Sequence, residues 1–436
     1  MSKRPFVAVV FGLSLVGLHV SHGKTWYVGG AGADFTDIPP AIAAASHGDV
    51  IIVRPGTYSG FTLDKGVIIR SSSDVFAVTD DILVTGISSG HQAGISGISS
   101  HWIAISNCDG EVVLERIYPI PGSQYGLGIQ NSSNVAVTHL ITTKSYPTIY
   151  PWQPPAAVSI GASRVRIADS LVRGFTGYDF YGDTGGSGGH GLHCANSLVW
   201  LADTTVIGGP GGDGYTTGTG FYCFRRDAGA GGDGIVALSS TVIAASTGDD
   251  LLLGGKGGTA YSDFACPFDK GRGGDGGNGF TGSSLVYSRI QLAGGLGGDG
   301  IPPGQDGEPY FGDARKDDSI PVLDMTGEQL PGSTQTVSLD AVSQSYAILL
   351  FSNVGGFVRI DNFYEPAWWW SVLPGSYFLV IPVVTNTVGD FSASFEVTDS
   401  PAAEGLVIQA QAVVFESGGS QRSFLSNAVV RVVGED

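Results

Sequence analysis

The sequence predicts an all-β protein in which a solenoid of stacked strands precedes a smaller β-domain. One strand-like segment recurs around a serine, at Ser133, Ser163, Ser197, Ser240 and Ser284, with spacings of 30, 34, 43 and 44 residues. A valine stands two positions after each serine, and apolar residues alternate with polar ones, as in a half-buried strand. Each repeat is too short to bury its own apolar face, so the copies must stack on one another.

An export signal is expected over residues 1–23. Lys3 and Arg4 form a basic start, 6–18 is an apolar run too short to cross a membrane, and Ser21 to Gly23 fits a small-residue cleavage site. Loss of the two basic residues changes the net charge from −18 to −20. So acidic a chain is a poor partner for nucleic acid or an anionic membrane surface. We expect a secreted or cell-surface protein without a membrane span.

The opening of the mature chain carries a resemblance to a known fold. An amphipathic helix is expected over 37–49, followed by the strand VIIVRPGTY (50–58), which contains Pro55-Gly56-Thr57-Tyr58. The stretch 26–60 resembles the N-terminal cap and first coil of right-handed parallel β-helix proteins, the pectin-lyase-like fold. The resemblance implies a right-handed parallel β-helix over 24–301 whose first coil is covered by the helix. Stacked strands lie about 4.8 Å apart, so a serine ladder beside an inward valine ladder is expected.

Glycine-rich phrases separate the later repeats. GGPGGDGYT (208–216) returns as GGLGGDGIP (294–302). We interpret such phrases as enlarged loops at one edge of the stack, where glycine permits positive φ and close backbone approach. The rival interpretation is calcium binding, because both phrases fit the calcium nonapeptide of secreted β-roll proteins.

The candidate metal ligands are the aspartates of these phrases, Asp213, Asp233, Asp275 and Asp299. Their separations of 20, 42 and 24 residues are never the nine that a tandem calcium roll requires. Weak calcium binding stays open, and no other cofactor is indicated.

The four cysteines are Cys108, Cys194, Cys223 and Cys266, and no pair has C-x-x-C spacing. Cys223 and Cys266 share an aromatic setting in successive glycine-rich insertions. A disulfide between them is expected outside the cell. Cys108 and Cys194 fall in strand-like sequence and are expected to be buried thiols.

The C-terminal part differs in character. Residues 302–333 are rich in proline, glycine and charge, without periodicity, and predict a linker. Short strand-like runs over 334–436 predict a β-sandwich, and the ending is loosely similar to small C-terminal β-domains of secreted bacterial repeat proteins. Trp368, Trp369 and Trp370 are candidate carbohydrate-binding residues. Successive strand residues face opposite ways, so at least one is expected in a core or domain interface.

Candidate catalytic residues follow from the resemblance, because parallel β-helix enzymes mostly cut acidic polysaccharides. A lyase of this fold is expected to combine aspartates that hold calcium with an Arg or Lys base. The candidates are Asp179, Asp183, His190, His193, Arg225, Arg226 and Asp227. Each is equally consistent with a polar loop residue. The N-T-D and R-x-K motifs of a polygalacturonase-type hydrolase are absent from the sequence.

Two functions therefore remain. The first is an exported non-catalytic scaffold, either a surface or adhesive protein or a binder of extracellular glycan, whose partner is an extracellular polysaccharide or cell-surface component. The alternative is a divergent polysaccharide lyase acting on an acidic polysaccharide. Low charge density, long glycine loops and the lack of a complete catalytic set favour the scaffold.

Overall fold

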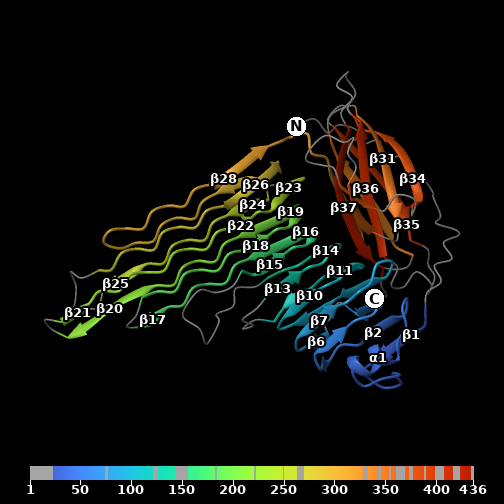
Figure 1. Cartoon of the computed structure of the whole chain (residues 1–436), viewed down its shortest axis with the longest axis horizontal. Helices are drawn as coiled ribbons and strands as arrows, with labels where there is room; N and C mark the ends of the chain where they lie inside the picture. Colours follow the sequence, from blue (N-terminus) through green and yellow to red (C-terminus); the bar gives the residue numbers. More distant parts are fainter. Residues whose placement is uncertain are drawn as a thin grey trace.

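The computed structural model describes residues 23–73, 77–120, 126–142, 156–181, 184–219, 222–248, 250–262, 270–327, 332–341, 345–352, 355–359, 369–372, 377–386, 389–397, 407–415 and 423–433. These residues form a parallel β-helix, a glycine-rich slab that projects from it, and a C-terminal antiparallel β-domain packed against it (Figure 1). No helix of this part of the chain has the length and apolar character needed to cross a bilayer.

The first face of the β-helix, face A, is a continuous parallel stack. Its strands, in chain order, are β1 (Thr25–Val28), β2 (Val50–Val53), β5 (Ile68–Ser71), β8 (Gln92–Ser96), β11 (Glu111–Glu115), β14 (Val135–Thr138), β16 (Arg164–Arg173), β19 (Leu198–Ile207), β23 (Thr241–Ala245), β26 (Phe280–Ser288) and β28 (Tyr310–Lys316). Each strand pairs with the equivalent strand of the next coil, which is the stacking that the sequence repeat predicts.

Two further stacks complete the coils. The second face runs through β4 (Phe61–Leu63), β7 (Ile82–Thr85), β10 (Ile103–Ser106), β13 (Leu127–Gln130), β15 (Val158–Gly161), β18 (Leu192–Ala195) and β22 (Ile235–Leu238) to the start of β26. The third is β3 (Thr57–Tyr58), β6 (Ala77–Thr79), β9 (Ile98–Ser100) and β12 (Tyr118–Pro119) in the early coils. In later coils β24 (Leu251–Leu253) and β27 (Gln291–Ala293) extend the end of β19.

The predicted valine ladder is confirmed. Val165 pairs with Val199 and Val199 with Val242, and all three side chains are fully buried in the core of the β-helix. The last step of the predicted register was wrong by one residue, because Val242 pairs with Leu285, whereas Val286 lies on the outer side of the sheet. Two adjacent serines there gave the sequence alignment two equivalent choices.

A short helix closes the N-terminal end of the stack. The helix α1 (Ile38–Ala44) is shorter than the predicted 37–49, since Asp37 is its N-cap and its last cap is Ala45. The Asp37 carboxylate accepts a hydrogen bond from the Ile38 N–H at 2.8 Å. Ile38, Ala41 and Ile42 are buried against the first coil. The helix therefore covers the apolar end that a first coil would otherwise expose.

The glycine-rich insertions form extended rods rather than irregular loops. We call these segments the glycine rods. Outgoing rods lead from the β-helix to the tip of each insertion, and they are 174–177, 208–214, 254–260 and 294–300. Returning rods lead back to the β-helix, and they are 185–191, 228–234, 271–279 and 302–309. Within one rod, Gly208, Gly211 and Gly214 donate to every third carbonyl of the next coil, those of Leu253, Lys256 and Thr259. Gly209 and Gly212 donate to a returning rod instead. Donors spaced by three residues are the geometry of an extended threefold helix of the polyproline II type.

Glycine is needed in these rods for space. A Cβ at Gly232 would lie 2.1 Å from the Gly189 carbonyl oxygen, and one at Gly255 would lie 2.0 Å from that of Gly209. The expectation of positive φ was wrong here, because no rod glycine that the structure describes has one. Close backbone approach, the other expected reason, is the one that holds. Outgoing and returning rods form two hydrogen-bonded layers, the slab, which reaches from the β-helix to a small distal sheet (Figure 1).

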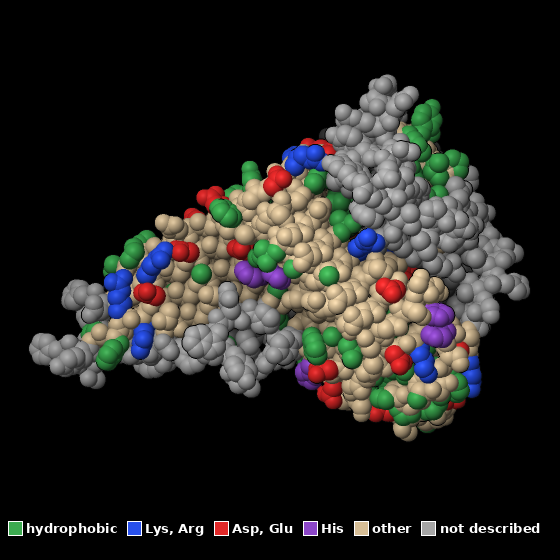
Figure 2. All heavy atoms as spheres, in the orientation of Figure 1, with side chains coloured by type: hydrophobic (Ala, Val, Ile, Leu, Met, Phe, Trp, Pro, Cys, Tyr) green, Lys and Arg blue, Asp and Glu red, His purple; other side chains and the backbone are tan. Residues whose placement is uncertain are grey.

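The distal sheet consists of β17 (Phe180–Tyr181), β20 (Gly214–Thr219) and β25 (Ala260–Ser262), with β21 (Tyr222–Phe224) as a hairpin partner of β20. Tyr215 and Tyr261 stack on adjacent strands with ring centroids 5.3 Å apart. Figure 2 shows Lys and Arg side chains on this distal part of the slab.

The C-terminal domain contains two antiparallel sheets that share one core. The first is β29 (Val322–Thr326), β30 (Thr334–Asp340) and β35 (Asp390–Glu396), and the second is β34 (Tyr377–Val384), β31 (Tyr346–Ser352), β36 (Val407–Phe415) and β37 (Ser423–Val432). The core joins Leu323 and Val337 of one sheet to Leu349 and Ile408 of the other. β32 (Gly355–Arg359) pairs separately with β33 (Trp369–Val372). The stretch 302–333, expected as a linker, contains a glycine rod, β28 and β29, so it belongs in large part to both folded units.

The C-terminal domain packs directly on face A. Trp200 and Ile243 of the β-helix lie in one apolar cluster with Leu350 and Val413 of the C-terminal domain. A second such cluster joins Val50, Val113 and Ala136 to Val407 and Val432.

A buried polar network lies between these two apolar clusters. Arg166 donates to Glu111 at 3.0 Å, to Asn134 at 3.1 Å and to Gln409 at 3.3 Å, and Gln409 donates to Glu111 at 2.6 Å. The side chains of Arg166 and Glu111 are only 4% and 2% exposed. Burial lowers the pKa of the Arg166 guanidinium, and the Glu111 carboxylate opposes that shift. The contact is therefore an internal interface with matched polar groups.

Candidate functional site

A repeated three-residue corner joins the second face to face A. Its first residue has a left-handed backbone, with φ of 48° at Asn131, 47° at Ala162, 50° at Asn196 and 48° at Ser239. Asparagine adopts this region more readily than most residues, which explains why it recurs here. The next residue is the ladder serine, and the residue after that lies at or next to the start of the face A strand.

The ladder serines hydrogen-bond from coil to coil. Backbone N–H groups of Ser132, Ser163, Ser197 and Ser240 donate to the hydroxyl oxygens of the next ladder serine at 3.0 to 3.1 Å. Each hydroxyl of these four donates to the carbonyl two residues before it. The predicted serine ladder therefore exists, but its first and last members are Ser132 and Ser283 rather than Ser133 and Ser284.

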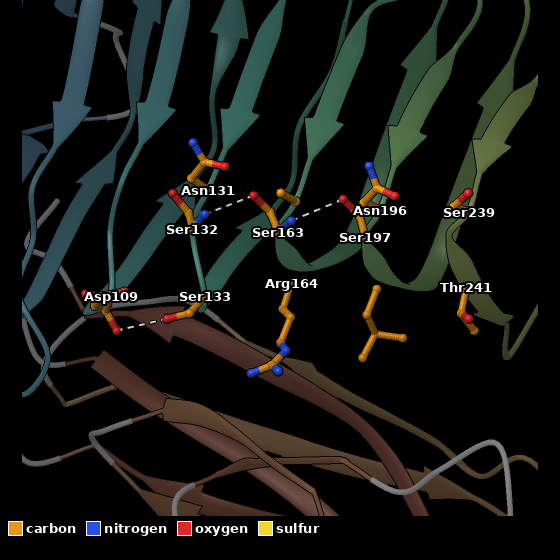
Figure 3. A pocket seen from close by; sticks show the side chains of 12 residues that line it. Asp109, Asn131, Ser132, Ser133, Ser163, Arg164, Asn196, Ser197, Ser239 and Thr241 are labelled. Carbon is orange, nitrogen blue, oxygen red and sulfur yellow. Dashed lines mark hydrogen bonds between the residues drawn. The ribbon is translucent and has the colours of Figure 1, made fainter.

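A groove of about 730 Å³ runs across these corners (Figure 3). Its lining is Asp109, Asn131, Ser132, Ser133, Ala162, Ser163, Arg164, Asn196, Ser197, Leu198, Ser239 and Thr241. The serine ladder forms its floor, and the side chains on either side project from it. Strands of the C-terminal domain pass close to Ser133 and Arg164 in Figure 3. The groove therefore follows the coil axis. A ladder serine recurs at each coil, whereas the positions on either side of it vary and include Ala162 and Leu198.

The groove presents mainly uncharged hydrogen-bonding groups. Its charged side chains are one carboxylate, Asp109, and one guanidinium, Arg164. Asn131 donates to the Asn107 side chain at 3.3 Å, and Ser133 donates to the Asp109 carbonyl at 3.0 Å. The ladder hydroxyls are bonded within the floor, so the amides of Asn131 and Asn196 and the hydroxyls of Ser239 and Thr241 are the groups that can pair with a ligand. Such groups both donate and accept, so the groove suits a ligand that carries many hydroxyls. Sequence reasoning missed this groove, although the residues preceding the ladder serines were a usable signal.

The aspartates proposed as calcium ligands hold the slab together. Asp213 accepts from the Thr259 N–H, Asp233 from the Asn278 N–H and Asp275 from the Gln305 N–H, at 2.7, 2.7 and 2.8 Å. For Asp299 the structure gives a backbone contact, in which its carbonyl accepts from Ala260. Among the described residues, no three His, Cys, Asp or Glu side chains gather as metal ligands would. The carboxylates of Asp213, Asp233 and Asp275 thus each accept a backbone N–H of the neighbouring rod.

The catalytic candidates are distributed along the slab. Asp179 accepts from the Asp213 N–H at 2.7 Å, and Asp227 accepts from the Arg272 N–H at 2.7 Å. Arg225 donates to the Ile301 carbonyl and lies 3.9 Å from Asp227. Arg226 contributes its backbone N–H to Thr216 Oγ1 at 3.3 Å, and Asp183 lies outside the described residues.

The two candidate histidines lie where the slab meets the β-helix. His190 Nδ1 accepts from the Asp233 N–H at 3.0 Å, and His193 lies in β18 between Ser159 and Val236. Burial lowers the pKa of His190, Asp233 raises it and His193 lowers it further. The assignment of these histidines and of the candidate arginines to one catalytic site stays a prediction.

Two other predicted features fall partly outside the described residues. Cys223 is disulfide-bonded, whereas Cys266, its expected partner, is not among the described residues, so the pairing stays a prediction. Cys108 and Cys194 are buried free thiols, as expected, and burial raises the pKa of Cys194 to about 12.

Two of the three candidate tryptophans lie in a strand of the C-terminal domain. Trp369 and Trp370 belong to β33, and Trp368 lies outside the described residues. A carbohydrate-binding role for these tryptophans stays a prediction.

No family model matches the chain, and no curated protein matches it. Among solved structures, it is similar to the enzymatically active domain of tailspike protein 2 of bacteriophage CBA120, at 9% identity and a TM-score of 0.26 over 93% of this chain and 71% of that one. Full-length tailspike protein 2 from Escherichia coli O157:H7 bacteriophage CAB120 gives 10% identity and a TM-score of 0.24 over 94% and 64%. The Dettilon tailspike protein gives 9% and 0.20 over 81% and 88%. With TM-scores this low, the assignment of a parallel β-helix rests on the strand pairing of this chain itself.

Proposed function

We propose that this protein is an exported, non-catalytic β-helix scaffold that binds an extracellular glycan in the corner groove. The observation that supports the proposal is the groove lining, which is polar except for Ala162 and Leu198 and crosses successive coils, with a ladder serine at each. A glycan is a repeating ligand rich in hydroxyls, and hydroxyl and amide side chains pair with such groups in both directions.

The charge of the groove indicates the class of glycan. Asp109 and Arg164 balance one another within the lining, and the whole chain carries a net charge of −18. A polyanionic sugar would be repelled by the protein at long range and would meet one guanidinium in the groove. We therefore infer a neutral glycan as the ligand.

Binding to a panel of neutral and uronate-containing oligosaccharides, measured by titration calorimetry on the full chain, tests the proposal. Asn131→Gly and Asn196→Gly remove groove side chains while glycine keeps the left-handed backbone. We expect each change to weaken binding by about tenfold, the value of one net hydrogen bond or slightly more. Asp203→Gly is the matched control, because Asp203 also has a left-handed backbone, with φ of 42°, but lies outside the groove lining and bonds to Ser246 and Thr247 rather than to a groove residue.

The same panel tests the alternative of a polysaccharide lyase. Release of products with the absorbance of an unsaturated uronate, reduced by Arg225→Ala or Arg226→Ala, would contradict the non-catalytic proposal. Binding of neutral glycans that is unchanged in both asparagine variants would contradict the assignment of the groove.

A further inference from the structure

The last coil of the β-helix carries exposed apolar side chains on β28 and on or directly after its outgoing rod. Leu296, Ile301, Tyr310 and Phe311 are all exposed, and Tyr310 and Phe311 on β28 are 47% and 68% accessible. Scattered apolar residues such as Leu296 and Ile301 are normal on a protein surface. Tyr310 and Phe311, in contrast, are neighbours on one strand whose edge is open, which indicates an interaction site.

The outer edge of β28 has no partner strand among the described residues. Every face A strand from β2 to β26 pairs with a strand on each side, whereas β28 pairs with β26 alone. In Figure 1, β28 is the outermost strand at that end of the stack. A strand edge with unpaired N–H and C=O groups is a template for another strand.

The rod that belongs to the same coil is closed to such an addition. In the previous returning rod, Gly273, Gly276 and Gly279 donate outward to the last rod. The equivalent positions of the last rod, 30 residues later, are Pro303, Asp306 and Pro309. Proline has no N–H to donate. The Asp306 carboxylate, in turn, accepts from the Gly297 N–H at 2.7 Å, where a further outgoing rod would have bound. The sequence of the last rod thus disfavours addition of a further rod to the slab, and β28 is the edge of this coil that remains open.

We propose that β28 pairs with β28 of a second copy of this chain, antiparallel about a two-fold axis at Ala314. The other end of the stack is covered by α1, so head-to-tail stacking is blocked and a tail-to-tail dimer closes on itself. The charge pattern of β28 fits this arrangement. Asp313 and Arg315 flank Ala314 on one face of the strand, so each Asp313 faces an Arg315 of the second copy.

The side chains of β28 are available for this pairing. Asp313 forms no ion pair or side-chain hydrogen bond with any residue that the structure describes, and Arg315 has only a contact of 3.8 Å with Asp317. Ala314 packs partly against the core of the β-helix, so the axis places the two open cores against each other. In this register Phe311 lies opposite Asp317 of the second copy, since both are three residues from the axis.

Sedimentation velocity over a range of protein concentrations tests the dimer. We expect Phe311→Asp to raise the dissociation constant more than about tenfold, because the register places the new carboxylate opposite Asp317 of the second copy, once on each side of the axis. Asp313→Arg should also weaken the dimer, whereas the double change Asp313→Arg with Arg315→Asp should restore it, since the swapped charges still pair across the axis. Tyr346→Asp is the control, because Tyr346 is 62% exposed on β31 of the C-terminal domain.

A cysteine at the axis gives an independent readout. Ala314→Cys should form a disulfide-linked dimer on mild oxidation, because residue 314 faces its own copy, while Cys108 and Cys194 are buried. A chain that stays monomeric at every concentration, or a dimer that Phe311→Asp leaves intact, would overturn the proposal. Association through β28 only with a different protein would overturn it as well.

Discussion

Single residues at the coil corners are fitted to their backbone to different degrees. Asn131 and Asn196 suit the left-handed conformation, whereas Ala162 adopts φ of 47° without a side chain that compensates. The corners are thus equivalent backbone sites, and the residues at them differ in how well they tolerate the left-handed conformation.

At this scale we expect Ala162→Asn to stabilise the protein by about 0.5 to 1 kcal/mol, since it removes part of the left-handed strain. It would also place an asparagine next to Asn131 and Asn196 in the corner series. Urea unfolding checks the value. Ala162→Val is the contrasting variant and should destabilise, because a β-branched residue tolerates positive φ poorly.

A second residue-scale prediction concerns pH. The pKa of His190 is lowered below its ordinary 6.5, chiefly by burial, and its Nδ1 must be unprotonated to accept the Asp233 N–H. As the pH falls through 6.5 the unfolded chain binds the proton before the folded chain does, so stability decreases on the acid side and is retained above. His190→Asn should remove this component, because Asn278 performs the same task in the slab without titrating.

Hydrogen exchange of the Asp233 amide, followed from pH 7.5 to 5, measures this effect locally. Equal pH dependence of exchange in the wild type and in His190→Asn would show that the His190 imidazole is not the cause of the loss of stability at acid pH.

Among the elements of this protein, the glycine rods place the strictest steric limit on which residue can be accepted. Gly232→Ala should destabilise by at least about 2 kcal/mol, because its Cβ would overlap the Gly189 carbonyl in a rod that has no room to shift. Gly248→Ala is the control, since open space surrounds Gly248 and its φ is not positive; its effect should stay within about 0.5 kcal/mol. Thermal unfolding of both variants compares the two. Equal effects would mean that glycine acts through chain entropy rather than through contact.

The elements differ in how well the sequence predicts them. The β-helix was predictable because period-two alternation and the Val165, Val199 and Val242 spacing report a strand with one buried face. Its register slipped at the end of the series, where Ser283 and Ser284 are adjacent and the pattern does not choose between them. The glycine rods have no apolar periodicity, so the sequence indicated loops there. The corner groove was missed because its polar residues resemble ordinary turns.

On the scale of the whole molecule, the docking of the C-terminal domain was beyond sequence reasoning. Arg166 and Gln409 are separated by 243 positions in the sequence. The sequence around either residue does not predict that it contacts the other. The interface contains apolar clusters and the buried ion pair of Arg166 with Glu111. Such a pair is costly to break, because the remaining charge stays buried without a partner.

We therefore expect Arg166→Met to destabilise by about 3 to 5 kcal/mol, since it leaves Glu111 buried opposite an apolar side chain. The double variant Arg166→Met with Glu111→Gln should recover a substantial part of the lost free energy of unfolding, because neither member of the buried pair then carries a charge. A double-mutant cycle by urea unfolding measures the coupling. Additive effects of the two changes would contradict a direct interaction between these side chains.

The slab has a consequence for behaviour in the cold. Its rods bury backbone rather than hydrocarbon, as the contacts of Gly232 and Gly255 show. Apolar burial loses strength on cooling and gives unfolding its large positive heat capacity, whereas exposing polar groups lowers that heat capacity. The slab therefore contributes little to the curvature of the stability profile with temperature. As the temperature falls, apolar burial in the β-helix core contributes less to stability, whereas the backbone contacts of the glycine rods are retained. Of the parts of this protein, the slab therefore loses the least stability in the cold.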